Sequence, residues 1–567
     1  MTLVFIKESA LQSHHEKQAA IYSCKVLLNC YLRECCENQR KLLKVNRQDH
    51  TFSLHFQASH ETIIGKFTFY SPNGEHEYAY FSLQNGQALS FTFLASLIVQ
   101  EYLQHNKAIT HDHVQDFIVR VENSYRNMAV FLKHATSNFI NDYLSSEQSL
   151  IYGHPFHPYP KNTVGFTSRE VATYCPELRT SFPLCYIAVR YDIFQETWVT
   201  ESAAHEFLQK FEYDVRQQLE FDDDNYRILP MHPWQYAYVQ TLEAVQEYER
   251  QQKIRFLGSS GPICYPTSSV RTVYIPQFKC NLKLSLSIQI TNMLRINSQE
   301  QMTRTLDAAH YLLAHDCFIE EQSTKVLYET GVCTCRFEEE ALTALFTMAY
   351  RPMVLDEKST YVVASLVEAP IQGKPCRLYE WLKGQNVEQW FRQYITISLL
   401  PIVRLADKKG IHFEAHLQNT LITLREGKPH IFWIRDLEGV SIEQEKVATQ
   451  SPAQGPLFYE KKQAWSRTKY YFMVNHLGSF IHALARDFQL SEAHFWQIVR
   501  EMLLEEWEQT QNELVAHLLT TSVFYAKKNL YSCLIGKSET PEYVAVKNAM
   551  YKGNEMYEID DSFHASK

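Results

Sequence analysis

Hydrophobic and polar residues alternate strictly along residues 281–295, and this is the clearest local pattern in the chain. A period of two residues is typical of a half-buried strand. Residues 268–275 are also rich in strand-forming residues, and residues 276–278 could form a turn between the two segments. The pattern therefore predicts a β-hairpin centred on Gln277. Its second strand places Leu282, Leu284, Leu286, Ile288 and Ile290 on one face and Lys283, Ser285, Ser287, Gln289 and Thr291 on the other.

Pairing about Gln277 would put Arg271 opposite Lys283 and Ser269 opposite Ser285. Like charges directly opposite each other destabilise a sheet, but an anion between them would reverse that effect. Two fixed cations beside hydroxyl groups suit phosphate or carboxylate oxygens. The alternative is a solvated hairpin face with two unrelated charges, and the pattern alone favours this plainer interpretation.

Longer segments show the helical spacing of apolar residues. They predict helices over residues 12–45, 91–104, 112–136, 233–252, 299–317, 387–409 and 491–519. Alternating segments predict strands over residues 51–56, 62–70, 78–83 and 325–335, and a strand pair around Gly427. Residues 258–261, Gly-Ser-Ser-Gly, are expected to form a flexible lead-in to the hairpin. This mixture predicts an α+β fold.

Composition narrows the class of protein. The 567 residues allow about three to four domain-sized units, and 45% hydrophobic residues suffice for full cores. A net charge of −9 without a basic tract argues against nucleic acid as a partner. The thirteen scattered cysteines and the absence of a signal-peptide pattern predict reduced thiols in the cytoplasm. The longest apolar stretch, residues 91–99, is too short to span a bilayer, so no membrane is expected.

Residues 153–165 form a loop rich in proline, because three prolines in six residues exclude a regular helix. The loop would present His154, His157 and Lys161. A zinc site lacks a third ligand nearby. A loop that holds these side chains against an anion is the better functional interpretation, and a rigid structural loop is the alternative.

Residues 412–439 carry a second polar pattern. His412, Glu414 and Asn419 follow the offsets of the protein-kinase catalytic loop, and Asp436 followed by Gly439 lies further on. Glu414 stands where kinases have aspartate, and two residues interrupt the Asp-Phe-Gly order. Carboxylates on two neighbouring segments are what a hard cation such as Mg²⁺ needs. The alternative is a buried loop whose polar groups are satisfied locally.

Together these features suit nucleotide–Mg²⁺ chemistry. The hairpin supplies cations, the second pattern supplies carboxylates, and the proline-rich loop adds His and Lys side chains. Thr291, Arg295 and His416 remain for a second, anionic substrate. The residues themselves do not decide which phosphorus atom is attacked.

Five ordered motifs resemble one family. Residues 153–161 read Gly-His-Pro-x-His-Pro-x-x-Lys, and residues 232–235 read His-Pro-Trp-Gln. Ser-x-Arg-Thr at 269–272, the segment from Lys283 to Arg295, and Glu-Ala-His-x-Gln-Asn at 414–419 follow. They are similar to the aerobactin-synthetase-like family, the siderophore synthetases that work independently of non-ribosomal peptide synthetases. The motifs span about residues 150 to 440 and show no departure from the family pattern.

The resemblance implies a cupped-hand architecture, usually dimeric, with a distantly kinase-like palm. The thumb would cover residues 1–125, the fingers 126–335 and the palm 336–567. It also implies an enzyme dependent on ATP and Mg²⁺ that activates a carboxylic acid, usually citrate, as an acyl-adenylate. A diamine or an amino-acid-derived amine would then capture the acyl group with release of AMP.

Residue roles follow from motif position. The triphosphate would be held by Ser269, Arg271, Thr272 and Lys283, with His154, His157 and Lys161 close to the phosphates. Glu414 and Asp436 would serve Mg²⁺, and Gln418 and Asn419 the nucleotide. The acid would be bound by Thr291, Arg295 and His416. Arg271, Lys283, Arg295 and His416 are the residues expected to act in catalysis.

Two other classes are considered. A small-molecule kinase would release ADP, but no Gly-rich loop precedes the 412–439 segment. A non-catalytic polycarboxylate-binding protein would leave Glu414 and Asp436 without a role.

Overall fold

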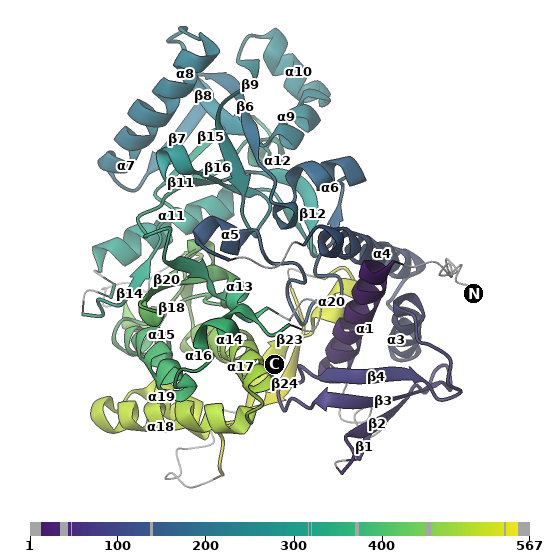
Figure 1. Ribbon diagram of the computed structural model, residues 1–567. Helices are drawn as coiled ribbons and strands as arrows, with labels where there is room; N and C mark the ends of the chain where they lie inside the picture. Colours follow the sequence, from purple (N-terminus) through teal and green to yellow (C-terminus); the bar gives the residue numbers. More distant parts are fainter. Residues whose placement is uncertain are drawn as a thin grey trace.

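The computed structural model describes residues 13–34, 43–46, 48–135, 140–315, 317–318, 320–368, 374–447, 455–537 and 540–553. Helices and sheets are mixed along the chain, so the predicted α+β class is confirmed (Figure 1). Among these residues, no helix is both long enough and apolar enough to cross a membrane.

An N-terminal layer of helices packs against a four-stranded antiparallel sheet. The periodicity predicted these elements well, except that the first helix ends at Glu34 and a strand begins at Leu43. The helices are α1 (His14–Glu34), α3 (Phe91–His105) and α4 (His111–His134), and the strands are β1 (Leu43–Asn46), β2 (Thr51–His55), β3 (Thr62–Phe69) and β4 (Glu77–Leu83).

Residues 182–352 supply a large antiparallel sheet of eight strands, seen in the upper part of Figure 1, in the order β7-β15-β16-β11-β10-β9-β6-β8. Residues 258–261 lie inside a long strand, so the expected flexible lead-in is wrong. The predicted helix over 233–252 divides near Thr241 into α9 (Pro233–Gln240) and α10 (Glu243–Arg250). The strands are β6 (Phe182–Arg190), β7 (Phe194–Trp198), β8 (Tyr226–Met231), β9 (Ile254–Pro266), β10 (Thr272–Ile275), β11 (Cys280–Lys283), β15 (Gly331–Cys335) and β16 (Met348–Pro352).

The predicted hairpin exists as β10 and β11, but its register differs by one residue. Thr272 lies opposite Lys283, so Arg271 and Lys283 are not a directly opposed pair. The cause is the turn: a 3₁₀ turn over Pro276–Phe278 is followed by Lys279 in the left-handed region (φ 45°), which adds a residue to the loop. A shift of one residue also moves each side chain to the other face.

The alternating segment 281–295 is divided between two sheets. Its first part, β11, lies in the middle of the eight-stranded sheet and is buried on both faces. Its second part, β12 (Leu286–Ile290), shows the expected alternation of burial and pairs with β5 (Thr163–Val164) and β13 (Met293–Arg295) in a three-stranded sheet. The segment therefore passes through two different environments.

The C-terminal region is mostly helical and surrounds a four-stranded sheet, β14-β20-β19-β17. The predicted helix over 387–409 is confirmed as α15 (Val387–Lys409), which ends at the left-handed Gly410. The predicted helix from Ser491 is two helices, because Gln511 is left-handed. The other elements are β14 (Thr324–Val326), β17 (Thr360–Val362), β19 (Thr420–Arg425), β20 (Lys428–Ile434), α16 (Lys461–Arg467), η8 (Thr468–Leu477), α17 (Gly478–Phe488), α18 (Glu492–Thr510) and α19 (Glu513–Thr520).

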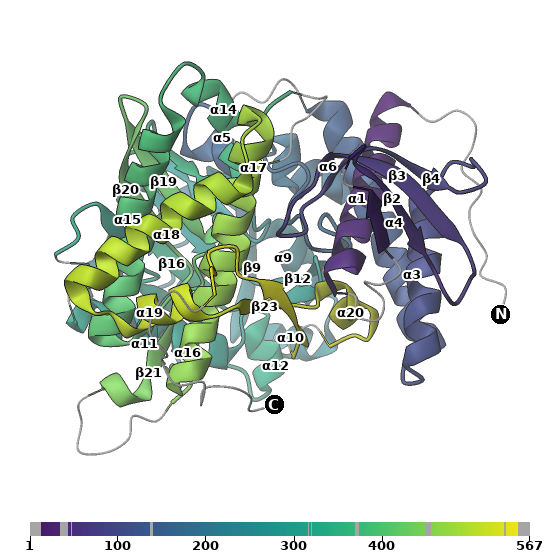
Figure 2. The ribbon, with the colours of Figure 1, turned by 90° about the horizontal axis from the view of Figure 1, so that it is seen from below.

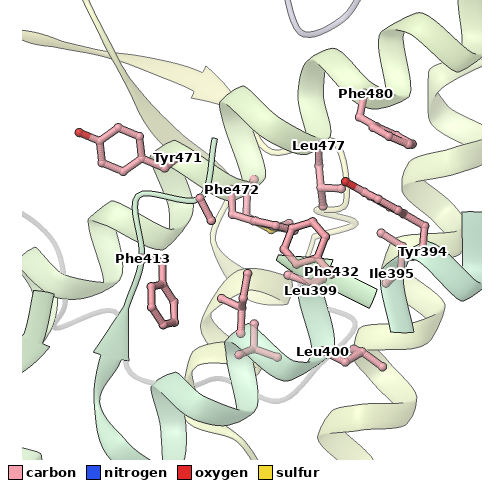
Figure 3. Close-up of a cluster of buried hydrophobic side chains, with 14 of the residues drawn as sticks. Tyr394, Ile395, Leu399, Leu400, Phe413, Phe432, Tyr471, Phe472, Leu477 and Phe480 are labelled. Atoms are coloured by element: carbon pink, nitrogen blue, oxygen red, sulfur yellow. The ribbon is translucent and has the colours of Figure 1, made fainter. Parts of the chain in front are cut away.

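Aromatic side chains fill the core of this region. Figure 3 shows Phe432 of β20 among residues from α15, η8 and α17, and Phe413 and Tyr471 near its edge. Tyr394 stacks on Phe480 with ring centroids 4.4 Å apart. This core fixes the backbone on either side of residues 412–419, the first part of the second polar pattern.

The final part of the described chain returns to the N-terminal layer. The hairpin β23 (Val523–Lys527) and β24 (Tyr543–Lys547) lies beside η8, and α20 (Asn529–Leu534) packs on α1 and α4 (Figures 1 and 2). Leu530, Cys533 and Leu534 belong to the N-terminal hydrophobic core. Residues far apart in sequence therefore share one core.

A buried charge cluster joins the β3–β4 hairpin to α17 and α18. His482 is fully buried; its Nδ1 lies 3.1 Å from Glu492 and its Nε2 3.5 Å from Glu77. Ser479 donates a hydrogen bond to Glu75 at 2.8 Å. Burial would lower the pKa of His482, but Glu75, Glu492 and Glu77 raise it to about 9. The imidazolium therefore neutralises buried carboxylates between two parts of the fold.

We expect His482 to make stability fall at alkaline pH. Because its folded pKa lies above the ordinary 6.5, its contribution is complete below pH 6.5 and is lost as the pH rises through about 9. The loss should be on the order of 3 kcal/mol. Urea denaturation of the wild type and of His482→Gln between pH 6 and 10 measures it. His476→Gln is the control, because the pKa of that buried histidine is lowered to about 3 and does not titrate in this window. Equal pH dependence in the wild type and His482→Gln would contradict the assignment.

Candidate active site

A tight turn between β9 and β10 carries Ser269 of the third motif and the preceding Ser268. Thr267 N donates to Thr272 O at 2.8 Å, and Val270 takes a left-handed conformation (φ 66°). Ser269 Oγ accepts from Thr272 N at 3.2 Å. The hydroxyls of Ser268 and Ser269 are half-buried. The turn thus places two hydroxyls at the start of the strand that pairs with Lys283.

Lys283 lies almost fully buried at the end of β11 and contacts two carboxylates. Its Nζ is 2.9 Å from Asp436 Oδ1 and 3.1 Å from Glu438 Oε2. Burial would lower the pKa of Lys283, but the Asp436 and Glu438 carboxylates outweigh it and raise the pKa above its ordinary value. Lys283 is therefore a fixed positive charge.

Asp436 follows β20 and begins the short turn Leu437–Gly439. Its φ of 71° lies in the left-handed region, which aspartate tolerates better than most residues. Glu329 accepts from Leu437 N at 3.2 Å and is ion-paired with the buried Arg351 of β16. Burial is the largest single influence and would raise the pKa of Asp436, but Lys283, Arg351 and Arg271 together outweigh it and hold the pKa below its usual range. The carboxylate is ionised, and Lys283 of β11 in the eight-stranded sheet holds it in place.

Arg271 is buried and donates to backbone and amide oxygens. Its Nη1 lies 3.2 Å from Arg295 O, 3.1 Å from Ile296 O and 2.7 Å from Asn297 Oδ1. Within the described ranges no carboxylate lies in ion-pair contact with it. Burial lowers the pKa of Arg271. The Glu438 and Asp436 carboxylates, which are not in direct contact with it, oppose this shift. A buried guanidinium without a contacting carboxylate suits an anionic ligand.

Arg295 carries a second guanidinium without a contacting carboxylate in the described part of the chain, and this one is half-buried. Its Nη2 donates to Ile290 O at 3.2 Å and Thr291 Oγ1 at 3.1 Å, and its buried Nε has no hydrogen-bond partner among the residues that the structure describes. Burial and the neighbouring Arg271 lower the pKa of Arg295 to about 10. Thr291 is left-handed (φ 56°), so the β12–β13 turn directs its hydroxyl to Arg295. Part of this guanidinium is free to bind an oxyanion.

Glu414 and His416 lie on the other side of Asp436. Their side chains are 27% and 26% exposed, and Glu414 Oε1 is 3.9 Å from His416 Nε2. Gly439 packs directly on Glu414, because a Cβ there would lie 2.6 Å from Glu414 Oε2. Partial burial lowers the pKa of His416 more than Glu414 and Asp436 raise it, so the imidazole is neutral at pH 7.

Gln418 and Asn419 stabilise the 414–419 segment through hydrogen bonds. Asn419 Nδ2 donates to Glu414 O at 3.2 Å, and Gln418 Nε2 donates to Ser268 Oγ at 3.2 Å. Gln418 thus links the 414–419 segment to the β9–β10 turn. The two predicted anion-binding segments meet in the fold.

The donor set around Glu414 and Asp436 fits Mg²⁺ shared with phosphates. The described residues contain no group of three or more His, Cys, Asp or Glu side chains arranged to hold a metal ion. Mg²⁺ commonly uses one or two protein carboxylates and takes its other ligands from phosphates and water. Two partly exposed carboxylates on adjoining segments meet that requirement.

The proline-rich loop lies on the Arg295 and His416 side. His154 is exposed and within electrostatic range of His416 and Lys527, and His157 is within range of Arg295. Lys161 is buried and paired with Glu177 at 2.7 Å. This pairing gives Lys161 a structural contact, and no contact among the described residues joins it to Arg271 or Lys283.

Sequence reasoning missed three side chains that border Glu414. Lys527 Nζ lies 3.0 Å from Tyr471 OH and is within electrostatic range of Glu414. Arg467 donates to Gly439 O at 3.3 Å. They come from η8, α16 and β23, far from the motifs in sequence, so no local pattern indicated them.

Glu147 is a fourth missed residue. It is 1% exposed, is ion-paired with Arg435, and accepts from Ser268 N at 3.1 Å and Ser268 Oγ at 2.8 Å. Arg435 also donates to Gln418 O at 2.8 Å. This buried pair connects the β9–β10 turn to the 418–436 region.

Two protein-family models and several known proteins match this chain. The family model described as "IucA / IucC family" matches residues 142–368, and one described as "Ferric iron reductase FhuF-like transporter" matches residues 388–541. The chain is 32% identical to L-2,3-diaminopropanoate–citrate ligase of Staphylococcus aureus, over 95% of this chain and 97% of the relative. It is 26% identical to spermidine–citrate ligase of Bacillus anthracis, over 82% and 86%.

A solved structure shares the fold. ATP-bound aerobactin synthetase IucA from a hypervirulent pathotype of Klebsiella pneumoniae is 23% identical and superposes with a TM-score of 0.82, covering 94% of this chain and 99% of that one.

Proposed function

The chain belongs to the IucA/IucC family of siderophore synthetases, and we propose that it uses ATP and Mg²⁺ to join citrate to an amine. One observation carries the proposal most strongly. Two guanidinium groups, the buried Arg271 and the half-buried Arg295, lie beside the Lys283–Asp436 pair, and neither contacts a carboxylate among the described residues. Such a set suits two anionic substrates, a triphosphate and a polycarboxylate.

The nucleotide would occupy the side formed by the β9–β10 turn and β11. Ser269, Arg271, Thr272 and Lys283 would hold the triphosphate. Glu414 and Asp436 would hold Mg²⁺, which neutralises charge on the phosphates. His154 and His157 face Arg295, His416 and Lys527, so we place them beside citrate instead of the phosphates, and Gln418 and Asn419 would keep Glu414 in place.

Citrate would occupy the side of Arg295, Thr291 and His416. Arg295 can offer its Nε and a terminal nitrogen to one carboxylate, because among the described residues only its Nη2 makes hydrogen bonds. Lys527 and Arg467, which border Glu414, would help to hold the remaining carboxylates. Fixing the acid at several points selects which carboxylate reacts.

The reaction would proceed in two steps. A citrate carboxylate oxygen attacks the α-phosphorus of ATP, the bond to the β-phosphate oxygen breaks, and pyrophosphate leaves. Arg271 and Lys283 offset the negative charge that accumulates during this step. The amine nitrogen then attacks the acyl carbon, AMP leaves, the amide forms and the nitrogen loses a proton.

The amine is proposed to be a diamine or an amino-acid-derived amine. This rests on the relatives described above, whose names specify L-2,3-diaminopropanoate and spermidine. We also propose a homodimer, a cytoplasmic location and the thumb, fingers and palm division at residues 1–125, 126–335 and 336–567. These stay predictions, and sedimentation velocity tests the first of them.

Pyrophosphate exchange tests the proposed function. With citrate, ATP and Mg²⁺ but no amine, the enzyme should exchange labelled pyrophosphate into ATP, and hydroxylamine should trap a citryl hydroxamate. Adding a panel of diamines and amino acids should yield AMP and a citryl amide, detected by mass spectrometry. Release of ADP with a phosphorylated product would replace the ligase by a small-molecule kinase. Citrate binding without any turnover of ATP would indicate a binding protein.

Arg295→Ala should raise KM for citrate by about 10- to 100-fold, because hydrogen bonds to a charged group contribute about 1.5–3 kcal/mol. The KM for ATP should change little, since Arg295 contacts the β12–β13 turn rather than the β9–β10 turn. Steady-state kinetics with each substrate varied in turn measures both. Arg295→Lys, which keeps the charge but loses the planar fork, should fall between the two. Equal shifts in both KM values would contradict the role given to Arg295.

A further inference from the structure

One short segment connects the candidate active site to the N-terminal layer. Lys527, at the end of β23, reaches Tyr471 beside Glu414. Lys528 N donates to Glu542 O at 2.8 Å, and α20 begins at the next residue. The position of α20 therefore constrains where Lys527 can lie.

Glu34 binds the first turn of α20 from the end of α1. Its Oε1 accepts from Leu530 N at 2.8 Å and its Oε2 from Tyr531 N at 2.9 Å, and the residue is 5% exposed. Both carboxylate oxygens are thus used by backbone N–H groups that α20 itself leaves without partners. Burial raises the pKa of Glu34 to about 8, although these two N–H groups and Arg33 act against it. Two accepting oxygens require the ionised carboxylate, so these contacts to α20 are complete above about pH 8.

The helix α20 also contacts the proline-rich loop. Asn529 Nδ2 donates to Phe156 O at 2.9 Å, and Cys533 Sγ lies 3.7 Å from His157 Nε2. Asn106, directly after α3, donates to Tyr531 OH at 2.5 Å. The helix is therefore held between α1, the end of α3 and the loop that carries His154 and His157 (Figure 2).

We propose that Glu34 is a positioning residue for the reaction: by holding the first turn of α20, it fixes Lys527 and the 154–157 loop against Glu414. Glu34 touches no substrate in this proposal. It acts through Lys527, whose backbone is separated from Leu530 by two residues. The kinetic part of the inference rests on the proposed function, because it takes citrate as the ligand beside Lys527.

Two variants each weaken one set of contacts that hold α20. Glu34→Gln leaves one acceptor oxygen and sets an amide donor against a backbone N–H, and Asn529→Ala removes the contact to Phe156. Measured at about pH 9, where Glu34 is ionised, each should raise KM for citrate by about 3- to 10-fold and leave KM for ATP within about twofold. Lys527→Ala should raise KM for citrate by about tenfold or more, as expected for the loss of a charged contact. The matched control is Glu101→Gln, because Glu101 is also a fully buried carboxylate of the N-terminal layer and accepts from Ala58 N at 2.6 Å, away from α20.

A double-mutant cycle separates positioning from general stability. If Glu34 acts through Lys527, Glu34→Gln combined with Lys527→Ala should have the citrate KM of Lys527→Ala alone. Additive effects of the two changes would overturn the proposal, as would a citrate KM in Glu101→Gln that rises as much as in Glu34→Gln.

A second measurement does not depend on catalysis. In Glu34→Gln the Leu530 and Tyr531 amides should exchange hydrogen for deuterium faster, and an amine-acylating reagent should modify Lys527 several-fold faster, as followed by mass spectrometry of peptides. Unchanged exchange and labelling would overturn the proposal even if the wild type is active. Absence of citrate-dependent pyrophosphate exchange in the wild type would refute the proposed function instead, and the exchange and labelling data would still decide the role of Glu34.

Discussion

Replacing Asp436 by asparagine should lower citrate-dependent pyrophosphate exchange by about 10²- to 10³-fold, the usual effect of removing one strong electrostatic contact at a reacting centre. Asp436 contacts Lys283 and is proposed to hold Mg²⁺, so its charge serves both substrates. Asparagine is the appropriate replacement, because it tolerates the left-handed backbone at this position (φ 71°). Amide formation and hydroxamate trapping should fall together with the exchange, since both follow the same first step.

Glu438→Gln is the matched control for Asp436→Asn. Glu438 also contacts Lys283, at 3.1 Å, but is given no metal role. Its loss of charge should lower the exchange less than tenfold, and its requirement for Mg²⁺ should stay near that of the wild type. Equal losses in the two variants would mean that Asp436 acts only by pairing with Lys283.

Glu147→Ala should destabilise the protein by about 3–5 kcal/mol, because it leaves the Arg435 guanidinium buried without its carboxylate. Both residues are nearly inaccessible, with side chains 0% and 7% exposed, so water cannot replace the lost contacts. The variant also removes the acceptor of Ser268, so the β9–β10 turn should lose its fixed position. Urea denaturation followed by circular dichroism measures the free-energy change.

An exposed ion pair provides the comparison for Glu147→Ala. Glu320 pairs with Lys408 at 2.8 Å, with side chains 74% and 60% exposed, and Glu320→Ala should cost less than about 1 kcal/mol. A small effect of Glu147→Ala would show that Arg435 finds another partner or reaches solvent when Glu147 is absent.

Periodicity predicted the helices of this fold better than their ends. The pattern over 387–409 gave α15 with its C-terminal Gly410, because that helix has a continuous apolar stripe and a glycine where the chain must turn left-handed. The helices predicted over 233–252 and 491–519 are interrupted near Thr241 and at Gln511. Neither break carries the Pro or Gly that usually indicates one, so local sequence gave no sign of it.

The hairpin shows where a two-residue period is insufficient. Alternation predicted strands on both sides of Gln277, but the register depended on Lys279 adopting a left-handed conformation, which a lysine does not indicate. Nor did the period distinguish β11, buried on both faces, from the half-buried β12. The difference arises because residues distant in sequence cover both faces of β11: Leu282 lies in a hydrophobic core, and Asn281 contacts Tyr143 and Met353.

The candidate site was predicted where motifs are local and missed where they are not. Arg271, Lys283 and Asp436 lie in segments with recognisable patterns, and the fold brings them into mutual electrostatic range. Lys527 and Glu147 have ordinary sequence surroundings. Their importance depends on long-range packing that places them beside Glu414 and Ser268.

The position of α20 has a consequence for how this protein is made. Leu530, Cys533 and Leu534 complete the core that α1 begins, so that core stays open until some five hundred further residues have been synthesised. At about 5–20 residues per second, the part of α1 that α20 covers would lack this contact for roughly half a minute to two minutes, although α3 and α4 can pack on α1 earlier. During that time the nascent N-terminal layer would expose apolar surface. Chaperones can bind such a surface, and unfinished chains can aggregate through it. Yield of folded protein should therefore depend on chaperone supply more strongly than the stability of the finished molecule would suggest.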